Sequence, residues 1–475
     1  MQRSFATHDP SGSRSPELKG GLNNMKAVKK LPVITKVSYA MGDLGANMVC
    51  QSVALYYLYF LTDVTFMRAS LAGISLMLVR CVDAFSDPLI GYFSDRTRTR
   101  WGRRRPYLLF GSFGCGLFFF LLFTYLPIRD QGLLFDHATF SYLIFYICFS
   151  LVNIPYSALT PDMTQDYDER TNLTAYRMTG AIIGMFVAAG LTSELIKLFP
   201  NERIGYSLTA AGYGVLFIIL TLIVFWGVRE NRDYSVKHDD TPMFRLYLNS
   251  FKNRPFVMVL LAYIMVELAI VLISSTLIYY MEYYMKKKEL LSTIFLTMFG
   301  SALICIPLWA LISKHLGKKW SYFMGTGLFS IAMICIFFIK PEDILLLYLL
   351  AALAGMGLST EFVYPWAMMP DTIEYNELMT GKRNEGVFYG MQSFGPKLSG
   401  ALAGLLAGEV LTLVHYVPKL VNQSSETLLG IRLIFCIVPV LFTGMGMVFI
   451  ALYPISHKKF QEIVAELDRR RAAQS

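Results

Sequence analysis

Residues 80–105 read RCVDAFSDPLIGYFSDRTRTRWGRRR. An apolar segment ends in this stretch, and it carries Arg80, Asp83 and Asp87 before a run of basic residues begins. About 20 apolar residues are enough to span a bilayer, and an ionised group near the centre of such a span costs about 2.5–3.5 kcal/mol. We therefore interpret these three charged residues as functional groups of a membrane span.

The composition of the whole chain indicates a protein that crosses the membrane many times. Of its 475 residues, 55% are hydrophobic and only 16% are charged, and the mean hydropathy is +0.46. A soluble globule of this length is less apolar, so we predict an all-α membrane protein with about twelve spans. The expected spans begin near Ser38, Leu71, Pro106, Ser141, Tyr176, Ser207, Phe256, Leu290, Tyr322, Leu345, Val387 and Leu433.

The formal net charge of +9 does not indicate a nucleic-acid partner, because the basic residues do not form one contiguous patch. They are concentrated in the tails and in the even-numbered loops, as the positive-inside rule predicts for a chain with both termini in the cytoplasm. The exception is the lysine run 286–288, which falls on the outer side in this topology. Residues 1–30 lack the apolar core of a cleavable signal peptide, so we interpret them as a disordered tail.

The spans fall into two groups of six, separated by the longest charged interruption, residues 229–254. A Pro-Asp pair follows the fourth span of each half, Pro161-Asp162 in the first and Pro370-Asp371 in the second. Such a parallel repeat is typical of transporters built from two related bundles. We therefore predict a tail (1–34), a first six-helix bundle (35–228), a central cytoplasmic loop (229–254), a second six-helix bundle (255–455) and a cytoplasmic tail (456–475).

Asp83 and Asp87 lie four residues apart, so on a helix their carboxylates share one face, with Ser86 beside them and Arg80 one turn earlier. Carboxylate and hydroxyl oxygens suit a small cation such as Na⁺, and two neighbouring carboxylates out of water favour sharing a proton. The stripe is therefore a candidate site for a coupling ion. The alternative is that Arg80 neutralises one aspartate and joins helices, which leaves the second carboxylate uncompensated.

A second polar stripe lies in the fourth span, where Ser150 and Asn153 are three residues apart, just before Pro155. A hydroxyl and an amide carbonyl at these positions would complete an oxygen cage with the two aspartates. A single Ser or Asn in a span more often joins helices, so this interpretation depends on the aspartates.

In the loop after the second span, the spacing of glycines, one acid and several bases is more specific than a simple run of basic residues. The spacing is formed by Gly91, Asp95, Arg96, Gly102, Arg103 and Arg104. It resembles the loop between the second and third helices of the major facilitator superfamily, in which an acid and several bases latch the two halves on the inner side. The alternatives are binding of lipid headgroups and ordinary topological anchoring.

Longer motifs bring the resemblance closer. Residues 83–91 (DAFSDPLIG), 153–156 (NIPY) and 370–375 (PDTIEY), together with Gln392 and Lys397, resemble the glycoside-pentoside-hexuronide:cation symporter family, the melibiose-permease type. These motifs are specific to that family and lie in both halves. The resemblance implies the fold of the major facilitator superfamily, with twelve transmembrane helices in two six-helix bundles, in a monomer of a bacterial inner membrane.

The resemblance also implies roles for individual residues. The coupling cation, Na⁺, Li⁺ or H⁺, would be bound by Asp83, Ser86, Asp87 and Ser150, with the two aspartates as transient Na⁺ ligands. The expected substrate site consists of Asn47, Arg80, Asn153, Arg177, Phe362 and Lys397. The loop residues Gly91, Asp95, Arg96, Gly102, Arg103 and Arg104 would control gating.

The expected substrate site departs from the melibiose permease. Asn47 and Asn153 replace aspartates that bind sugar hydroxyls in that protein, and Phe362 replaces a tryptophan. Neutral amides hydrogen-bond hydroxyls less strongly than carboxylates do, so these differences speak against galactoside specificity.

We predict a secondary active transporter that couples a cation gradient to symport of a sugar or glycoside by alternating access. The sequence has no G-x-x-x-x-G-K-[ST] loop and no convergent nucleophile and base, so we expect neither ATP use, nor catalysis, nor a cofactor. A lysophospholipid or other amphipathic solute is the alternative, because residues 365–371 (PWAMMPD) also resemble the animal sodium-dependent lysophosphatidylcholine symporters. Drug/proton efflux is a weaker alternative. Three further acids, Asp43, Glu267 and Glu361, either face the cavity or are paired within the bundles.

Overall fold

The protein is almost entirely helical in the part that the computed structural model describes, residues 31–163, 167–230, 250–381, 385–420 and 422–474. The first half contains α2 (Val33–Tyr59), extended by a π-helical turn (Phe60–Val64), α3 (Ala69–Arg96), α4 (Arg105–Leu122), α5 (Gln131–Met163), α6 (Tyr167–Lys197) and α7 (Glu202–Gly227). The second half contains α9 (Arg254–Tyr279), extended by a π-helical turn (Tyr280–Tyr284), α10 (Leu291–Phe337), α11 (Ile344–Thr380), α12 (Glu385–Leu413), α13 (Ser425–Arg432), α14 (Val438–Leu452) and α15 (His457–Gln474).

The number of spans agrees with the prediction from the sequence. Ten helices in the described residues are long and apolar enough to cross a membrane. One of these, α10, consists of two helices that meet at Gly317, where φ is 79°. Glycine adopts this left-handed conformation without a steric penalty, so the expected loop is reduced to a sharp turn. α12 lies outside the ten and carries Lys397 and Glu409 in its interior. The two parts of α10 and the addition of α12 account for the twelve expected spans.

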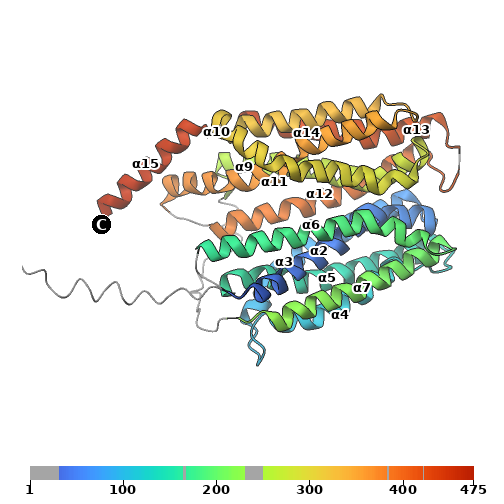
Figure 1. Ribbon diagram of the computed structural model, residues 1–475, viewed down its shortest axis with the longest axis horizontal. Coiled ribbons are helices and arrows are strands. Elements are labelled where there is room, and N and C mark those ends of the chain that lie inside the picture. Colours follow the sequence, from blue (N-terminus) through green and yellow to red (C-terminus); the bar gives the residue numbers. More distant parts are fainter. Residues whose placement is uncertain (1–30, 164–166, 231–249, 382–384, 421, 475) are drawn as a thin grey trace, which may run out of the picture.

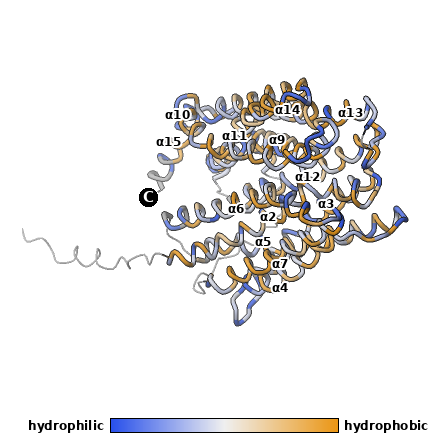
Figure 2. Tube along the Cα trace, turned by 45° about the vertical axis from the view of Figure 1, so that its right-hand side comes forward, coloured by the Kyte–Doolittle hydropathy of each residue, from blue (hydrophilic) through white to orange (hydrophobic). Residues whose placement is uncertain are grey.

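The helices form two bundles, α2–α7 and α9–α14, which lie one above the other in Figure 1. In the first bundle α2 packs on α6 and α7, and α4 packs on α5 and α7; in the second, α10 packs on α11 and α14, and α9 packs on α12 and α14. The bundles meet where α12 packs on α3, α2 on α9 and α10 on α6. Hydrophilic residues gather at the helix ends (Figure 2), as expected for helices in a bilayer. The fold class is confirmed, whereas the exact bundle boundaries stay a prediction.

Several helices begin where local sequence satisfies their free backbone N–H groups. The side chain of Asn201 accepts a hydrogen bond from the backbone of Arg203 at the start of α7, and that of Asn253 accepts one from Phe256 at the start of α9. Asparagine is a preferred N-cap, and the proline early in α9 is favourable because a first-turn residue needs no N–H partner. These caps fix where two of the spans begin.

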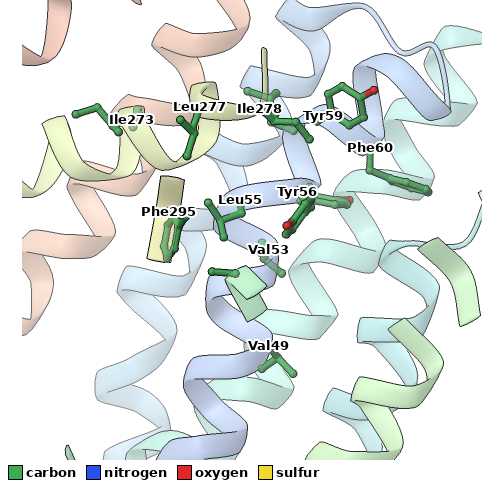
Figure 3. Close-up of a cluster of buried hydrophobic side chains, with 14 of the residues drawn as sticks. Val49, Val53, Leu55, Tyr56, Tyr59, Phe60, Ile273, Leu277, Ile278 and Phe295 are labelled. Atoms are coloured by element: carbon green, nitrogen blue, oxygen red, sulfur yellow. The ribbon is translucent and has the colours of Figure 1, made fainter. Parts of the chain in front are cut away.

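The two bundles are in close contact at the end of the molecule that carries Asp63, which we call the Asp63 end; the opposite end carries loop 97–104 and is called the basic-loop end. A Cβ added to Gly73 on α3 would lie 2.8 Å from the carbonyl oxygen of Gly404 on α12, so the two backbones touch there. An apolar cluster seals the same end (Figure 3), with Leu55 from α2, Leu277 from α9 and Phe295 from α10.

Candidate functional site

A buried cluster of three charges joins the bundles at the centre of the molecule. The ammonium group of Lys397, on α12, lies 3.0 Å from Asp83 Oδ2 and also contacts a carboxylate oxygen of Asp87, both on α3. The Ser150 hydroxyl, on α5, donates a 3.0 Å hydrogen bond to Asp83 Oδ1. The structure therefore brings together Asp83, Asp87 and Ser150, as predicted, with a lysine from the other bundle between the carboxylates.

The cluster carries an excess of negative charge. The Asp83 side chain is 2% exposed and that of Asp87 is 28% exposed, so the pair is more accessible on the Asp87 side. Asp87 Oδ1 is buried and has no hydrogen-bond partner in the described part of the chain. One ammonium and two carboxylates leave one negative charge uncompensated. A second small cation or a proton fits this charge balance.

Ser86 and Arg80 flank the cluster but do not take part in it directly. The Ser86 hydroxyl donates to the backbone carbonyl of Asp83, 3.0 Å away, which leaves its lone pairs available to a ligand. The Arg80 guanidinium lies over the ring of Tyr146, 4.2 Å from its centroid, and packs against Gly400 of α12. In the structure, the ammonium of Lys397 lies against the aspartates. The guanidinium of Arg80 does not take this position, contrary to the alternative interpretation.

A second buried ion pair lies within the first bundle. Arg177 Nε donates to Asp43 Oδ2 at 2.6 Å, and its Nη2 atom donates to Asp43 Oδ1 at 3.2 Å. The hydroxyl of Tyr156 donates to the same carboxylate at 2.6 Å. Arg177 was predicted to lie near the substrate, and here its guanidinium is held in a fork on Asp43. Asp43 is thus paired within the bundle.

The uncharged residues of the predicted substrate site, Asn47, Asn153 and Phe362, come from three different helices, α2, α5 and α11. Asn47 Nδ2 donates to the backbone carbonyl of Asp43, 2.9 Å away. Phe362 is 41% exposed on α11, and its ring lies 6.5 Å from that of Phe299. Gln392, part of the family motif, is fully buried, and neither its amide oxygen nor its nitrogen has a hydrogen-bond partner among described residues. A buried amide without partners is suited to receive a polar ligand.

Loop 97–104 is folded around a carboxylate of its own bundle. The backbone N–H groups of Arg103 and Arg104 donate to Glu230 at 2.7 and 2.8 Å. Gly102 has φ 112°, and a Cβ there would lie 2.5 Å from Glu230 Oε1. Only glycine fits this position. The sequence reasoning missed Glu230, which lies three residues after the end of α7.

The other predicted gating residues lie at the end of α3. Gly91 has room for a Cβ, whose nearest neighbour would be Ile154 at 3.9 Å. The Arg96 guanidinium lies 3.5 Å from the centroid of the Tyr92 ring. The side chain of Asp95 lies outside the described part of the structure. In the second half, the ammonium of Lys318, just after the turn at Gly317, lies 2.7 Å from a carboxylate oxygen of Asp371.

A network that the sequence did not predict closes the Asp63 end. Asp63, fully buried at the end of α2, accepts hydrogen bonds from Tyr283 of the second bundle and, at 2.6 Å, from Tyr416. The neighbouring Thr62 hydroxyl lies 2.7 Å from that of Tyr279. A carboxylate inside the first apolar span was the signal for this site, but its partners are more than 200 residues away in sequence.

An ion network surrounds this hydrogen-bonded core. Glu202 of the first bundle lies 3.0 Å from Lys288 and 2.5 Å from Lys419, both in the second half. Lys288 also lies 3.1 Å from Glu282. This arrangement explains the lysine run 286–288 in part, because Lys288 is held by two carboxylates. Between described residues, the polar contacts that link the bundles lie at this end or at Lys397.

Comparisons with known proteins agree with the geometry. The family model described as MFS/sugar transport protein matches residues 38–457. The chain is similar to the uncharacterized symporter YnaJ of Bacillus subtilis, with 33% identity over 93% of this chain and 96% of that protein. It is also similar to the glucuronide carrier protein homolog of Escherichia coli, with 32% identity over 93% of this chain and 96% of that protein. The solved structure of the nucleoside transporter NupG shares the fold, with a TM-score of 0.64 at 13% identity, over 87% of this chain and 99% of that one.

Proposed function

The chain belongs to the family of MFS/sugar transport proteins, and on that premise we propose that it is a cation-coupled symporter of a sugar or glycoside. It works by alternating access, as a monomer in a bacterial inner membrane with both termini in the cytoplasm. The relatives support this assignment, since one is named a symporter and another a glucuronide carrier homolog. The same premise supports transport rather than catalysis.

The contact of Lys397 with Asp83 and Asp87 is the single observation that carries the proposal. A monovalent cation, the lysine ammonium, already sits between two carboxylates of the other bundle. Na⁺, Li⁺ or a proton that reaches Asp87 competes with this ammonium and loosens the tie between the bundles. Movement of one charge through 100 mV supplies about 2.3 kcal/mol, enough for a roughly fifty-fold accumulation of solute.

The contacts at the Asp63 end support alternating access. If the basic-loop end faces the cytoplasm, as the positive-inside rule predicts, the outer side is closed by Asp63, Glu202 and their partners. This state would admit or release solute on the cytoplasmic side. The opposite state requires these contacts to break together.

The polar groups near the ion cluster support a hydroxylated solute. Asn153 lies on α5 one turn from Ser150, Gln392 lies on α12 as Lys397 does, and neither amide has a hydrogen-bond partner among the described residues. Amide groups donate and accept, so they suit hydroxyl groups. Arg177 acts on the solute indirectly in this proposal, because Asp43 holds its guanidinium.

The test is uptake into proteoliposomes of labelled glycosides, pentosides, glucuronides and lysophospholipids under imposed Na⁺ or proton gradients. We expect gradient-driven accumulation of a sugar derivative by the wild type and its loss in Asp87→Asn. Glu342→Gln, a change at an exposed carboxylate, is the control and should leave accumulation intact. Accumulation of a lysophospholipid alone would replace the substrate class, and full activity in Asp87→Asn would reject the ion site.

A further inference from the structure

Two acids inside the spans of the second bundle have no role in the ion cluster. Glu361 on α11 is 3% exposed, and Glu267 on α9 is partly buried. Neither forms an ion pair within 4 Å with a described residue. Burying a carboxylate in a span without a counter-charge is costly, so these acids require an explanation.

Among the described residues, the surroundings of Glu361 contain hydroxyl groups and a second acid, but no cation. Tyr322, from the second part of α10, is itself 1% exposed and donates a hydrogen bond to Glu361 Oε2. The other carboxyl oxygen, Oε1, is buried and has no partner among the described residues. From α9, Glu267 and Tyr263 lie within electrostatic range.

In the part of the chain that the structure describes, the remaining helices that pack on α11, namely α12 and α15, bring no compensating charge to this position. Lys397 of α12 is held by Asp83 and Asp87 in the other bundle. α15 reaches the far end of α11, where Arg470 donates to the carbonyl of Leu378. An ionised Glu361 would therefore be a bare charge next to another acid, whereas a neutral carboxyl group lacks only one hydrogen-bond partner. The second penalty is much the smaller.

We propose that Glu361 is a proton-binding site in the second bundle, distinct from the cation site on α3. Glu267 is the more exposed of the two acids, so it carries the negative charge of the pair. Two neighbouring acids that share one charge hold a proton on the more buried member. The ligand is a proton, and Tyr322 positions the carboxyl group that carries it.

This site goes beyond the proposed symport, and its test needs no transported solute. The infrared C=O stretch of a protonated carboxyl group lies apart from that of a carboxylate. We expect purified full-length protein in detergent at neutral pH to show such a band, and Glu361→Gln to lose the intensity of one carboxyl group. Glu342→Gln, at an exposed acid, is the control and should leave the band unchanged.

A second variant keeps the proposal open to refutation if Glu361→Gln does not fold. Tyr322→Phe removes the hydrogen bond to Oε2, so the band should remain and move to higher frequency. A band that is absent in the wild type, unchanged in Glu361→Gln or unmoved in Tyr322→Phe would overturn the proposal. Loss of symport in the uptake assay would leave it standing, because the infrared result does not depend on transport.

Discussion

Removal of a single hydroxyl group at the Asp63 end should open the contact between the bundles. Tyr283 of the second bundle donates a hydrogen bond to the buried carboxylate of Asp63 in the first. A hydrogen bond of this kind contributes about 1–3 kcal/mol net, and the contact exists only while this end is closed. About 1.4 kcal/mol changes an equilibrium tenfold, so Tyr283→Phe should raise the ratio of open to closed molecules roughly 5- to 150-fold.

The next residue in the sequence provides a matched control. Tyr284 donates a 2.7 Å hydrogen bond to the carbonyl of Ile339, and both residues belong to the second bundle. Tyr284→Phe therefore removes the same hydroxyl group without touching the interface between the bundles. The control variant should keep the wild-type equilibrium, even if it loses some stability.

The assay is a distance measurement between spin labels at Arg129→Cys and Glu342→Cys, exposed positions on opposite bundles at this end. The labels belong in a cysteine-free background, because all seven native cysteines are free thiols and two are exposed. We expect a second, longer distance to gain population in Tyr283→Phe. Identical distance distributions for Tyr283→Phe and Tyr284→Phe would refute the reasoning.

Three further outcomes follow from the structure. Lys397→Gln should raise the affinity for Na⁺ about tenfold or more in calorimetry, because a like charge within 4–6 Å of the site is removed, while net uptake falls. Gly102→Ala should lower the melting temperature, because the new Cβ strains a backbone with φ 112° and displaces Glu230, at a cost of about 1–3 kcal/mol. The control is Gly212→Ala, where a Cβ meets open space, and it should leave the melting temperature unchanged. Na⁺ or pH should change the affinity for the transported solute, and the solute should change the cation affinity by the same factor; a solute affinity equal under all cation conditions would contradict coupling.

The fold and the ion cluster could be predicted from the sequence because both depend on short-range patterns. Apolar length sets a span, and most expected starts lie within a few residues of the observed helices, such as Phe256 against Arg254 for α9. Two aspartates four residues apart share a helix face whatever the tertiary structure. The family resemblance assigned Lys397 to the expected substrate site, and the structure places it in direct contact with both aspartates.

The contacts at the Asp63 end could not be predicted from the sequence because they depend on how the two bundles pack against each other. Glu202 stands at the start of α7 and reads as an ordinary first-turn acid, yet it pairs with Lys288 and Lys419 across the interface. Similarly, Arg177 matched a position near the substrate, but no local pattern reveals that Asp43 occupies its guanidinium. Pairing between charges that are far apart in the chain depends on how the bundles pack, and it leaves no periodic pattern in the sequence.

The position of Lys397 bears on how coupling avoids a leak. Without a bound cation, two bare carboxylates at the bundle interface would cost several kcal/mol, and the empty carrier would be held in the state that hydrates them. The ammonium supplies one charge in that state, so the empty carrier can change conformation. In the proposed mechanism, an arriving cation releases the ammonium from Asp87, and the central tie weakens while the contacts at the Asp63 end remain. On this proposal the solute must then supply the free energy that moves the bundles, so we expect that cation alone does not cross.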